Sequence, residues 1–114
     1  MAADPRDLLP LKPLVFQILL GLSAGERHGW SLVKEVREQA GGDRILPANF
    51  YRTLRGMLDD GLVEESERRR PADDDERRRY FKLTPLGEAA ARLEARRLRQ
   101  IMADTRTKRL LGKA

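Results

Sequence analysis

The sequence predicts a single, mainly α-helical domain with one small β-hairpin, followed by a long C-terminal helix. At 114 residues the chain has room for one domain, and a hydrophobic content of 40% is enough for a modest core. Only 5% of the residues are aromatic, so the core must be largely Leu, Val, Ile and Ala, which favours packing between helices. Apolar residues recur at helical spacing along most of the chain, with one pair of extended runs among them.

Apolar periodicity predicts the first two helices. The segment 13–22 is apolar nearly all round, which indicates a buried helix. A second helix is expected over residues 28–42, and it ends at consecutive glycines, which are common at helix C-termini. On this second helix Trp30, Val33 and Val36 form the stripe that we expect to face the core.

A third helix is expected between residues 47 and 61. Pro47 can open it at the first helical position, or Asn49 can cap it one step later. The predicted buried stripe consists of Phe50, Leu54, Met57 and Leu58. The opposite side carries Asn49, Arg52 and Arg55, with Tyr51 near the border.

Two extended runs, 62–67 and 78–83, predict a β-hairpin whose loop is centred on Pro71. Arginine triplets flank this loop, and an acidic run lies at its tip. Alternation along the second strand sends successive side chains to opposite faces. On that strand we expect Phe81 and Leu83 to face inward, and Tyr80 and Lys82 outward.

A last helix has a strong start signal in Thr84-Pro85, with Thr as the cap and Pro at the first helical position. We expect one helix that runs to about Leu111. Its apolar stripe is longer than three short helices and a hairpin can cover. This stripe consists of Leu86, Ala89, Ala90, Leu93, Leu98, Ile101 and Met102.

Three helices followed by a two-stranded hairpin with basic flanks have the order of a winged helix-turn-helix. In that architecture the third helix enters the major groove of DNA, and the hairpin, or wing, lies along the backbone or in the adjacent minor groove. The expected organisation is an N-terminal extension (1–12), a winged-helix unit (13–84), a C-terminal helix (85–111) and a tail (112–114).

The net charge of +5 indicates a polyanionic partner, but the charge is unevenly distributed. Residues 1–84 hold 15 basic and 15 acidic residues, whereas residues 85–114 hold 8 basic and 3 acidic ones. The basic residues of the last helix could flank DNA, pair with acids across a dimer, or face water. Because two such helices at a dimer axis bring like charges together, at least some must point outward or pair with Glu88, Glu94 or Asp104. The basic residues of the last helix are Arg92, Arg96, Arg97, Arg99, Arg106, Lys108 and Arg109.

The acidic tip of the hairpin loop, residues 73–76, has three interpretations. It could lie beyond the DNA and shield the arginines, which would limit nonspecific binding. It could instead pair with the basic last helix of a partner, or be simply solvated, as charged loop tips usually are. A calcium loop is not expected, because the required spacing of acids and Gly is absent.

Three segments, in this order and spacing, carry a family resemblance: ILLGLSAGERHGWSLVKEV, LPANFYRTLRGMLDDGLVEES and RRRYFKLTPLGEAAARLE. The chain resembles the PadR-like winged-helix transcriptional regulators over roughly residues 11–111. The segments look like the family's His-Gly-aromatic second helix, its Leu-Tyr recognition helix with a Gly-Leu turn into the wing, and its Arg-rich strand leading to Leu-Thr and Gly. Where many members have Ser-Leu-Tyr-Pro, residues 49–52 read Asn-Phe-Tyr-Arg, so the base preference of other members is not carried over.

The resemblance implies cytoplasmic homodimers that bind partly palindromic operators and usually repress, some of them released by a small molecule. It also implies that the last helix makes the dimer, which agrees with the uncovered apolar stripe, and it places the chain with the short forms of the family. The residues expected in the dimer interface are Leu86, Ala90, Leu93, Leu98, Ile101 and Met102.

The candidate DNA-binding residues lie on the third helix and in the wing. Arg can read guanine bidentately, whereas a Tyr hydroxyl more often contacts phosphate, and Asn49 could bind adenine or cap the helix. The alternative is an ordinary solvated helix face, and strand alternation turns about half of the wing arginines elsewhere. The candidates are Asn49, Tyr51, Arg52, Arg55, Arg68, Arg69, Arg70, Arg77, Arg78 and Arg79.

Other classes of site are disfavoured. The chain has no Cys, which excludes disulfides and thiolate zinc sites, and its single histidine, His28, allows no His cluster. We expect His28 at a helix start or in a buried hydrogen bond. A nucleophile elbow, a phosphate-cradling Gly loop and metal-ligand spacing are absent, so no catalytic residue, metal or cofactor is expected. Trp30 is expected to pack in the core, with stacking on a ligand as the alternative.

The sequence therefore predicts a cytoplasmic, dimeric, double-stranded-DNA-binding transcriptional regulator, with a small-molecule effector as an open possibility. No window approaches a membrane span, and the opening residues lack the pattern of a signal peptide. The alternative is a winged-helix module that docks a protein partner without specific DNA binding. The two hypotheses predict a different dependence of binding affinity on salt. A DNA binder releases about 0.9 counterions per neutralised phosphate, so its affinity falls steeply with salt, whereas a protein interface need show no such loss.

Overall fold

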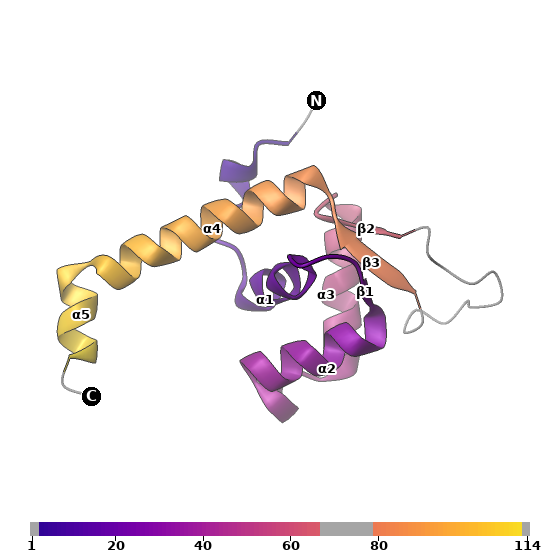
Figure 1. Ribbon diagram of the computed structural model, residues 1–114, viewed down its shortest axis with the longest axis horizontal. Helices are drawn as coiled ribbons and strands as arrows, with labels where there is room; N and C mark the ends of the chain where they lie inside the picture. The colour runs from indigo at the N-terminus through magenta and orange to yellow at the C-terminus, as the bar shows by residue number, and fades with distance from the viewer. Residues whose placement is uncertain (1–2, 67–78, 113–114) are drawn as a thin grey trace.

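The computed structural model describes residues 3–66 and 79–112, which form a mostly helical domain with a small antiparallel sheet at one end (Figure 1). This confirms the predicted fold class. In chain order the helices are η1 (Pro5–Leu8), α1 (Pro13–Leu22), α2 (Gly29–Ala40), η2 (Gly42–Arg44), α3 (Pro47–Asp59), α4 (Pro85–Ala103) and α5 (Thr105–Leu111). The strands are β1 (Arg27–His28), β2 (Val63–Glu65) and β3 (Tyr80–Leu83).

The core lies where α1 packs against α2, α3, the first half of α4 and the sheet. Helix α1 begins at Pro13, as predicted, and buries Ile18, Leu19 and Leu22. It is not buried all round, however, because Leu20 is 44% exposed. One face of α1 is therefore left open beside α2.

Helix α2 begins at Gly29 and ends at Ala40, with Gly41 as its C-cap, close to the predicted limits. Its buried stripe contains Leu32, Val33 and Val36, whereas Trp30 is 37% exposed. The prediction that Trp30 packs in the core was wrong. Leu32 was not among the residues predicted for the buried stripe. Its burial shifts the centre of the stripe, so that at 100° per residue Trp30 lies roughly 115° away from that centre.

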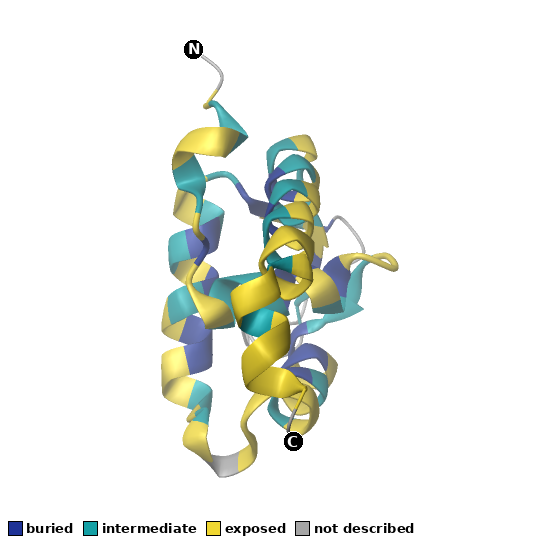
Figure 2. Ribbon diagram, turned by 90° about the vertical axis from the view of Figure 1, so that its left-hand side faces the viewer, coloured by how far each residue is buried: buried dark blue, intermediate teal, exposed yellow. Residues whose placement is uncertain are grey.

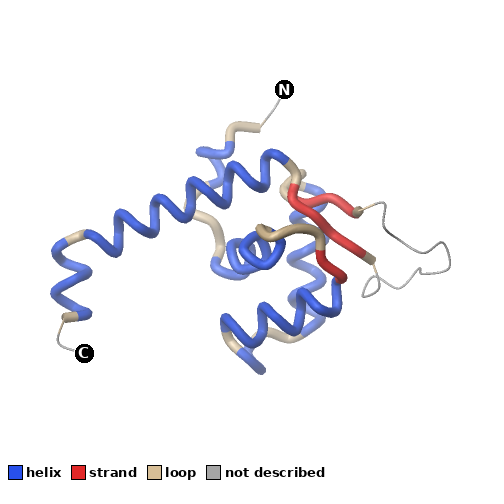
Figure 3. The backbone as a smooth tube through the Cα atoms, viewed as in Figure 1, coloured by secondary structure: helices blue, strands red, loops and turns tan. Residues whose placement is uncertain are grey.

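The sheet has three strands in the order β1-β3-β2, all antiparallel, where the sequence predicted two (Figure 3). The additional strand, β1, pairs Arg27 with Phe81 and His28 with Tyr80. Phe81 is buried and Lys82 is exposed, as alternation predicted. Because β1 leads directly into α2, this strand ties the start of α2 to the base of the hairpin.

The predicted single C-terminal helix is divided in two. The backbone of Asp104 is extended, with φ −63° and ψ 135°, so α4 ends at Ala103 and α5 begins at Thr105. The Asp104 carboxylate caps α5 by accepting a hydrogen bond of 2.8 Å from the backbone N–H of Arg106. An Asp at this position satisfies a free helix N–H and favours a new helix start over continuation.

The N-terminal residues form an element that the sequence analysis did not predict. Helix η1 lies next to α4 (Figure 1). Leu11, which follows it, is buried in the core. The backbone N–H of Leu11 donates a hydrogen bond of 3.1 Å to Glu94 on α4, whose side chain is 3% exposed. Residues 4–11 therefore lie along α4 and are attached to it by a buried carboxylate.

The molecule is elongated, with principal extents of 54 × 38 × 21 Å. Helix α4 runs across the top of the body in Figure 1, and α5 turns down from its far end, so that α4 and α5 project away from the sheet. Figure 2 shows that exposed residues dominate the end of α4 and all of α5. Over the described residues, no helix is long and apolar enough to cross a membrane.

Candidate nucleic-acid interface

The outward face of α3 presents polar and basic side chains. Helix α3 begins at Pro47, with Leu46 as its cap, so Asn49 lies inside the first turn and does not cap the helix. Phe50, Leu54 and Met57 are buried, which turns Asn49, Arg52 and Arg55 to the exposed side. The structure thus brings three of the predicted residues together on one helix face.

Tyr51 does not share this exposed face. Its side chain is only 7% exposed, and its ring packs edge to face on Phe50 with ring centroids 5.5 Å apart. Tyr51 lies roughly 90° from the centre of the stripe formed by Phe50, Leu54 and Met57 at 100° per residue, and the core against α3 is broad enough to include it. Tyr51 therefore supports the placement of α3 from behind instead of lining its outer surface.

A turn at Gly61 connects α3 to the wing. Gly61 has φ +78°, a conformation that strongly favours glycine, and the N–H of Leu62 donates to the carbonyl of Met57. Thr84 then closes the turn, because its hydroxyl donates to the Gly61 carbonyl at 2.5 Å and its N–H donates to the Leu62 carbonyl at 3.2 Å. The same hydroxyl accepts from the N–H of Gly87 and so caps α4. One residue thus fixes the wing base and α4 to the end of α3.

The wing base pairs Val63 with Leu83 and Glu65 with Phe81. Of the six predicted wing arginines only Arg79 lies among the described residues; Arg68, Arg69, Arg70, Arg77 and Arg78, like the acidic tip 73–76, lie outside them. The Arg79 side chain is 31% exposed and lies 3.6 Å from the Glu65 carboxylate. Lys82 is likewise 3.6 Å from Glu64.

The start of α2 is joined to the wing by a backbone contact, since the N–H of Gly29 donates to the carbonyl of Arg79 at 2.9 Å. His28 holds the cap position of α2, and its ring packs edge to face on Tyr80 with centroids 5.2 Å apart. This agrees with the expected helix-start position of His28.

Next to the start of α2, the Trp30 ring is exposed, and the Lys34 ammonium lies over it, 5.5 Å from the ring centroid. This exposed basic and aromatic pair was not predicted, because Trp30 was expected in the core. Recognition of Leu32 as a stripe residue would have revealed it.

The basic last helices pair with the acids that the sequence analysis named. Arg92 binds Glu88 at 2.7 Å, Arg97 binds Glu94 at 2.5 Å and Arg106 binds Asp104 at 2.9 Å. Hydrogen bonds from these arginines hold the pKa values of the Glu94 and Asp104 carboxyls below their usual range. The other basic residues of this region are exposed: Arg96, Arg99, Lys108 and Arg109.

The predicted dimer residues divide into two groups. Leu86 and Ala90 pack into the core of their own chain. Leu93 and Leu98 are half-buried, and Ile101 and Met102 are 42% and 54% exposed. Only the latter half of the predicted stripe is therefore available to a partner. Across residues 3–66 and 79–112, no group of acidic or histidine side chains is arranged to hold a metal ion.

The chain matches the model of the transcriptional regulator PadR-like family over residues 18–93. That range includes α2, α3, the hairpin and the first half of α4. No match was found among curated proteins.

Several solved structures share the fold. H. salinarum RosR is 25% identical, with a TM-score of 0.66 and a match that covers 94% of this chain and 92% of that one. A PadR family transcription regulator from Clostridium difficile R20291 is 20% identical, with a TM-score of 0.65 over 81% and 96% of the two chains. The transcriptional repressor CouR, solved bound to a 23-mer DNA duplex, is 26% identical, with a TM-score of 0.62 over 96% and 69%.

Proposed function

Because the chain belongs to the transcriptional regulator PadR-like family, we propose that it binds double-stranded DNA sequence-specifically as a homodimer and represses transcription from a partly palindromic operator. A repressor of similar structure, CouR, was solved on duplex DNA. Two-fold symmetry in the protein is matched by palindromic half-sites in DNA, spaced by one helical turn or a multiple of it.

The observation that carries this proposal is the outward face of α3. Asn49, Arg52 and Arg55 are exposed side by side on a helix whose other face is anchored in the core. Arg forms bidentate hydrogen bonds with guanine, and Asn does so with adenine. A rigid helix that presents these side chains can read base edges in the major groove.

In the same proposal the wing contributes affinity and register. Its arginines contact phosphates or the minor groove, and these contacts position the protein without reading sequence. Lys34 on α2 adds a further exposed cation, next to the Trp30 ring.

Dimerisation in this proposal uses the apolar residues of α4 that the body does not cover: Leu93, Leu98, Ile101 and Met102. Exposed apolar side chains such as those of Ile101 and Met102 are typical of interaction sites when they lie together. The ion pairs of Arg92 and Arg97 with acids on their own helix reduce the repulsion between two basic helices.

The test is fluorescence anisotropy with the DNA upstream of the protein's own coding region and a scrambled duplex of equal length, across a salt series. We expect preferential binding of the first duplex and a steep loss of affinity with salt. Arg52→Ala and Arg55→Ala should each cost about 1 to 3 kcal/mol at particular base pairs. Lys12→Ala, which removes an exposed charge at the start of α1, should leave base preference unchanged.

Equal, weak and salt-insensitive binding of both duplexes would reject the proposal. It would favour the alternative of a winged-helix module that docks a protein. Unchanged base preference in both arginine variants, with tight binding retained, would leave DNA binding in place but remove α3 as its reader.

A further inference from the structure

A cavity of about 560 Å³ lies at the base of the wing. Its walls come from the end of α1 and the loop after it, from the residue after β2, from β3 and from the first turn of α4. Of the described residues that line it, none belongs to α3, so this wing-base cavity is separate from the candidate DNA-reading face. Its volume lies within the range of small-molecule sites, about 300 to 1,000 Å³.

The wing-base cavity has an apolar wall that belongs to the packed body of the protein. Leu22 is only 2% exposed, and Leu83 is half-buried and packs against the core. Ser66, which also lines the cavity, is 7% exposed. The cavity is therefore a hollow in the body and is more than a gap between exposed side chains. Its apolar wall can hold the hydrocarbon part of a ligand.

Two carboxylates line the same cavity, those of Glu26 and Glu88. The Ser66 hydroxyl donates a hydrogen bond to the Glu26 carboxylate and so orients it. Glu88 lies in the first turn of α4 and is paired with Arg92 at 2.7 Å, in a pair whose two side chains are both exposed. Exposed ion pairs are weak, so this carboxylate can accept from a ligand at little cost.

An ammonium group lines the cavity as well. Lys82 on β3 is 47% exposed, and its ammonium lies 3.6 Å from the Glu64 carboxylate, which is 52% exposed. This pair is also exposed and loosely joined, so a ligand carboxylate can take the place of Glu64. The wing-base cavity thus combines groups of both charges with an apolar wall.

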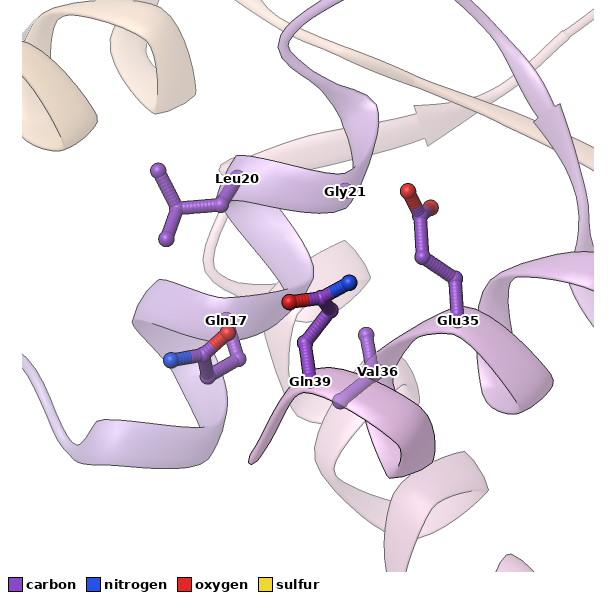
Figure 4. A pocket seen from close by; sticks show the side chains of 6 residues that line it. All are labelled: Gln17, Leu20, Gly21, Glu35, Val36 and Gln39. Carbon is purple, nitrogen blue, oxygen red and sulfur yellow. The ribbon is translucent and has the colours of Figure 1, made fainter. Parts of the chain in front are cut away.

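The cavity between α1 and α2 is different in kind. Figure 4 shows the amides of Gln17 and Gln39 between the two helices, with the Glu35 carboxylate farther along α2. Its volume is about 200 Å³, and its one carboxylate is bound to Arg27 at 2.5 Å. No cation is among the described residues that line it. Only the wing-base cavity can therefore pair with both ends of a doubly charged ligand.

We propose that the wing-base cavity binds a small zwitterion of amino-acid size with an apolar side chain. The ligand ammonium donates to the carboxylates of Glu26 and Glu88, and the ligand carboxylate accepts from Lys82. The ligand side chain contacts Leu22 and Leu83. Charge-assisted hydrogen bonds are stronger than neutral ones, so a ligand that lacks either charge loses one of the two polar contacts.

The position of the cavity couples the ligand to the wing. Lys82 belongs to β3, whereas Glu26 precedes β1, so a zwitterion held by both bridges the wing base and the loop after α1. Its ammonium competes with the Ser66 hydroxyl for Glu26, a contact that now joins the end of β2 to this loop. We therefore expect the ligand to weaken DNA binding by about 5-fold or more. This coupling, unlike the site itself, rests on the DNA binding of the proposed function.

Amide-resolved NMR spectroscopy of the purified protein tests the site in the absence of DNA. The probes are L-leucine, isoamylamine, which lacks the carboxylate, and isocaproate, which lacks the ammonium. We expect L-leucine to shift the amide signals of Gly25, Ser66 and Lys82 in a saturable way. Each of the other two probes should bind about 10-fold more weakly, because each loses one charged contact.

Two variants separate the roles of the charged groups. Lys82→Met should weaken L-leucine binding by about 10-fold and leave isoamylamine binding unchanged, because only L-leucine carries the carboxylate that Lys82 binds. Glu26→Gln should weaken the binding of both. The matched controls, Lys12→Met and Glu38→Gln, make the same changes of charge at exposed positions that do not line the cavity, and should leave both affinities unchanged.

The outcomes distinguish the site from the proposed function. Absence of saturable shifts at the cavity, or shifts confined to Gln17 and Gln39, would overturn the site. Equal affinity for L-leucine and isoamylamine would overturn recognition of both charges. Anisotropy with the upstream duplex then tests the coupling, which is overturned if saturating L-leucine leaves DNA affinity unchanged. Protein that binds L-leucine as expected but binds no DNA in its absence would reject the proposed function and leave the site standing.

Discussion

The body of the molecule and its C-terminal arm place the same kinds of residue in opposite environments. In the body, residues 13–94, large apolar side chains such as Phe50 and Leu54 are fully buried. In the arm, residues 95–111, Ile101, Met102 and Leu110 are 42%, 54% and 83% exposed. The apolar residues of the body thus stabilise the core of the chain, whereas the exposed apolar residues of the arm contribute little to it.

The largest difference between the two regions should appear in the stability of a single chain. Phe50→Ala leaves a cavity in the core, and we expect it to lower the free energy of unfolding by about 3 to 5 kcal/mol. Met102→Ala removes a side chain that is 54% exposed and should change the free energy of unfolding by less than about 0.5 kcal/mol. Urea denaturation followed by circular dichroism, at a concentration where sedimentation shows monomer, measures both. Equal losses in the two variants would contradict the distinction between body and arm.

A charged residue in the arm should prevent dimerisation without unfolding the single chain. Ile101→Asp places a carboxylate on the exposed stripe of α4, so the monomer should fold while the dimer dissociates. Loss of bivalent engagement should weaken operator binding by about 10²-fold, with much less effect on a single half-site. Sedimentation and anisotropy with full and half operators measure this. A stable dimer in the variant would place the interface elsewhere.

Local patterns accounted for most of the fold, and the errors have identifiable causes. The start of α4 was predicted because Pro at a first helical position is a local signal. The same signal at Pro47 was one of the two starts expected for α3, and the inward position of Phe81 followed from strand alternation. Strand β1 was missed because two residues carry no periodicity; its pairing depends on a distant partner. The cap at Asp104 was readable in the sequence but was outweighed by a continuous apolar stripe.

The candidate site was predicted less completely than the fold. Exposure of Asn49, Arg52 and Arg55 followed from helical spacing alone. The burial of Tyr51 did not, because the width of a buried stripe depends on how many elements pack against the helix. Glu94 was named only as an acid with which the basic residues of the last helix could pair, and its burial beneath the N-terminal residues was not predicted, because no local pattern indicates that these residues pack on α4.

The junction of body and arm tests how tightly the two regions are joined. A Cβ on Gly87 would overlap the carbonyl of Leu62, a backbone atom that cannot move without disturbing the wing base. We expect Gly87→Ala to cost about 1 to 3 kcal/mol of unfolding free energy. Gly56→Ala is the matched control, since nothing lies within 4 Å of the added methyl, and it should stabilise α3 by about 0.5 to 1 kcal/mol. A neutral Gly87→Ala would mean that α4 shifts freely on the sheet.

The smallest effect concerns the buried carboxylate that attaches the N-terminal residues to α4. The hydrogen bond from Arg97, together with that from the Leu11 N–H, holds the pKa of Glu94 below its ordinary value, against the opposing effect of burial. A lowered folded pKa means that ionised Glu94 contributes stability above the unfolded pKa of about 4.3, and that this is lost as pH falls through the folded value.

Glu94→Gln should therefore cost about 1 kcal/mol at pH 7, discounted because Arg97 is 35% exposed. The difference from wild type should be smaller at pH 3, which lies below the unfolded pKa of about 4.3, so that part of the stability contributed by ionised Glu94 is already lost. Glu88→Gln removes an exposed pair with Arg92 and should cost only about 0.3 to 0.5 kcal/mol. Urea denaturation of the three proteins at both pH values provides the comparison. If the free energy of unfolding of Glu94→Gln differed from that of wild type by the same amount at pH 7 and pH 3, the charge of Glu94 would not be what holds the N-terminal residues on α4. Packing would then hold them there.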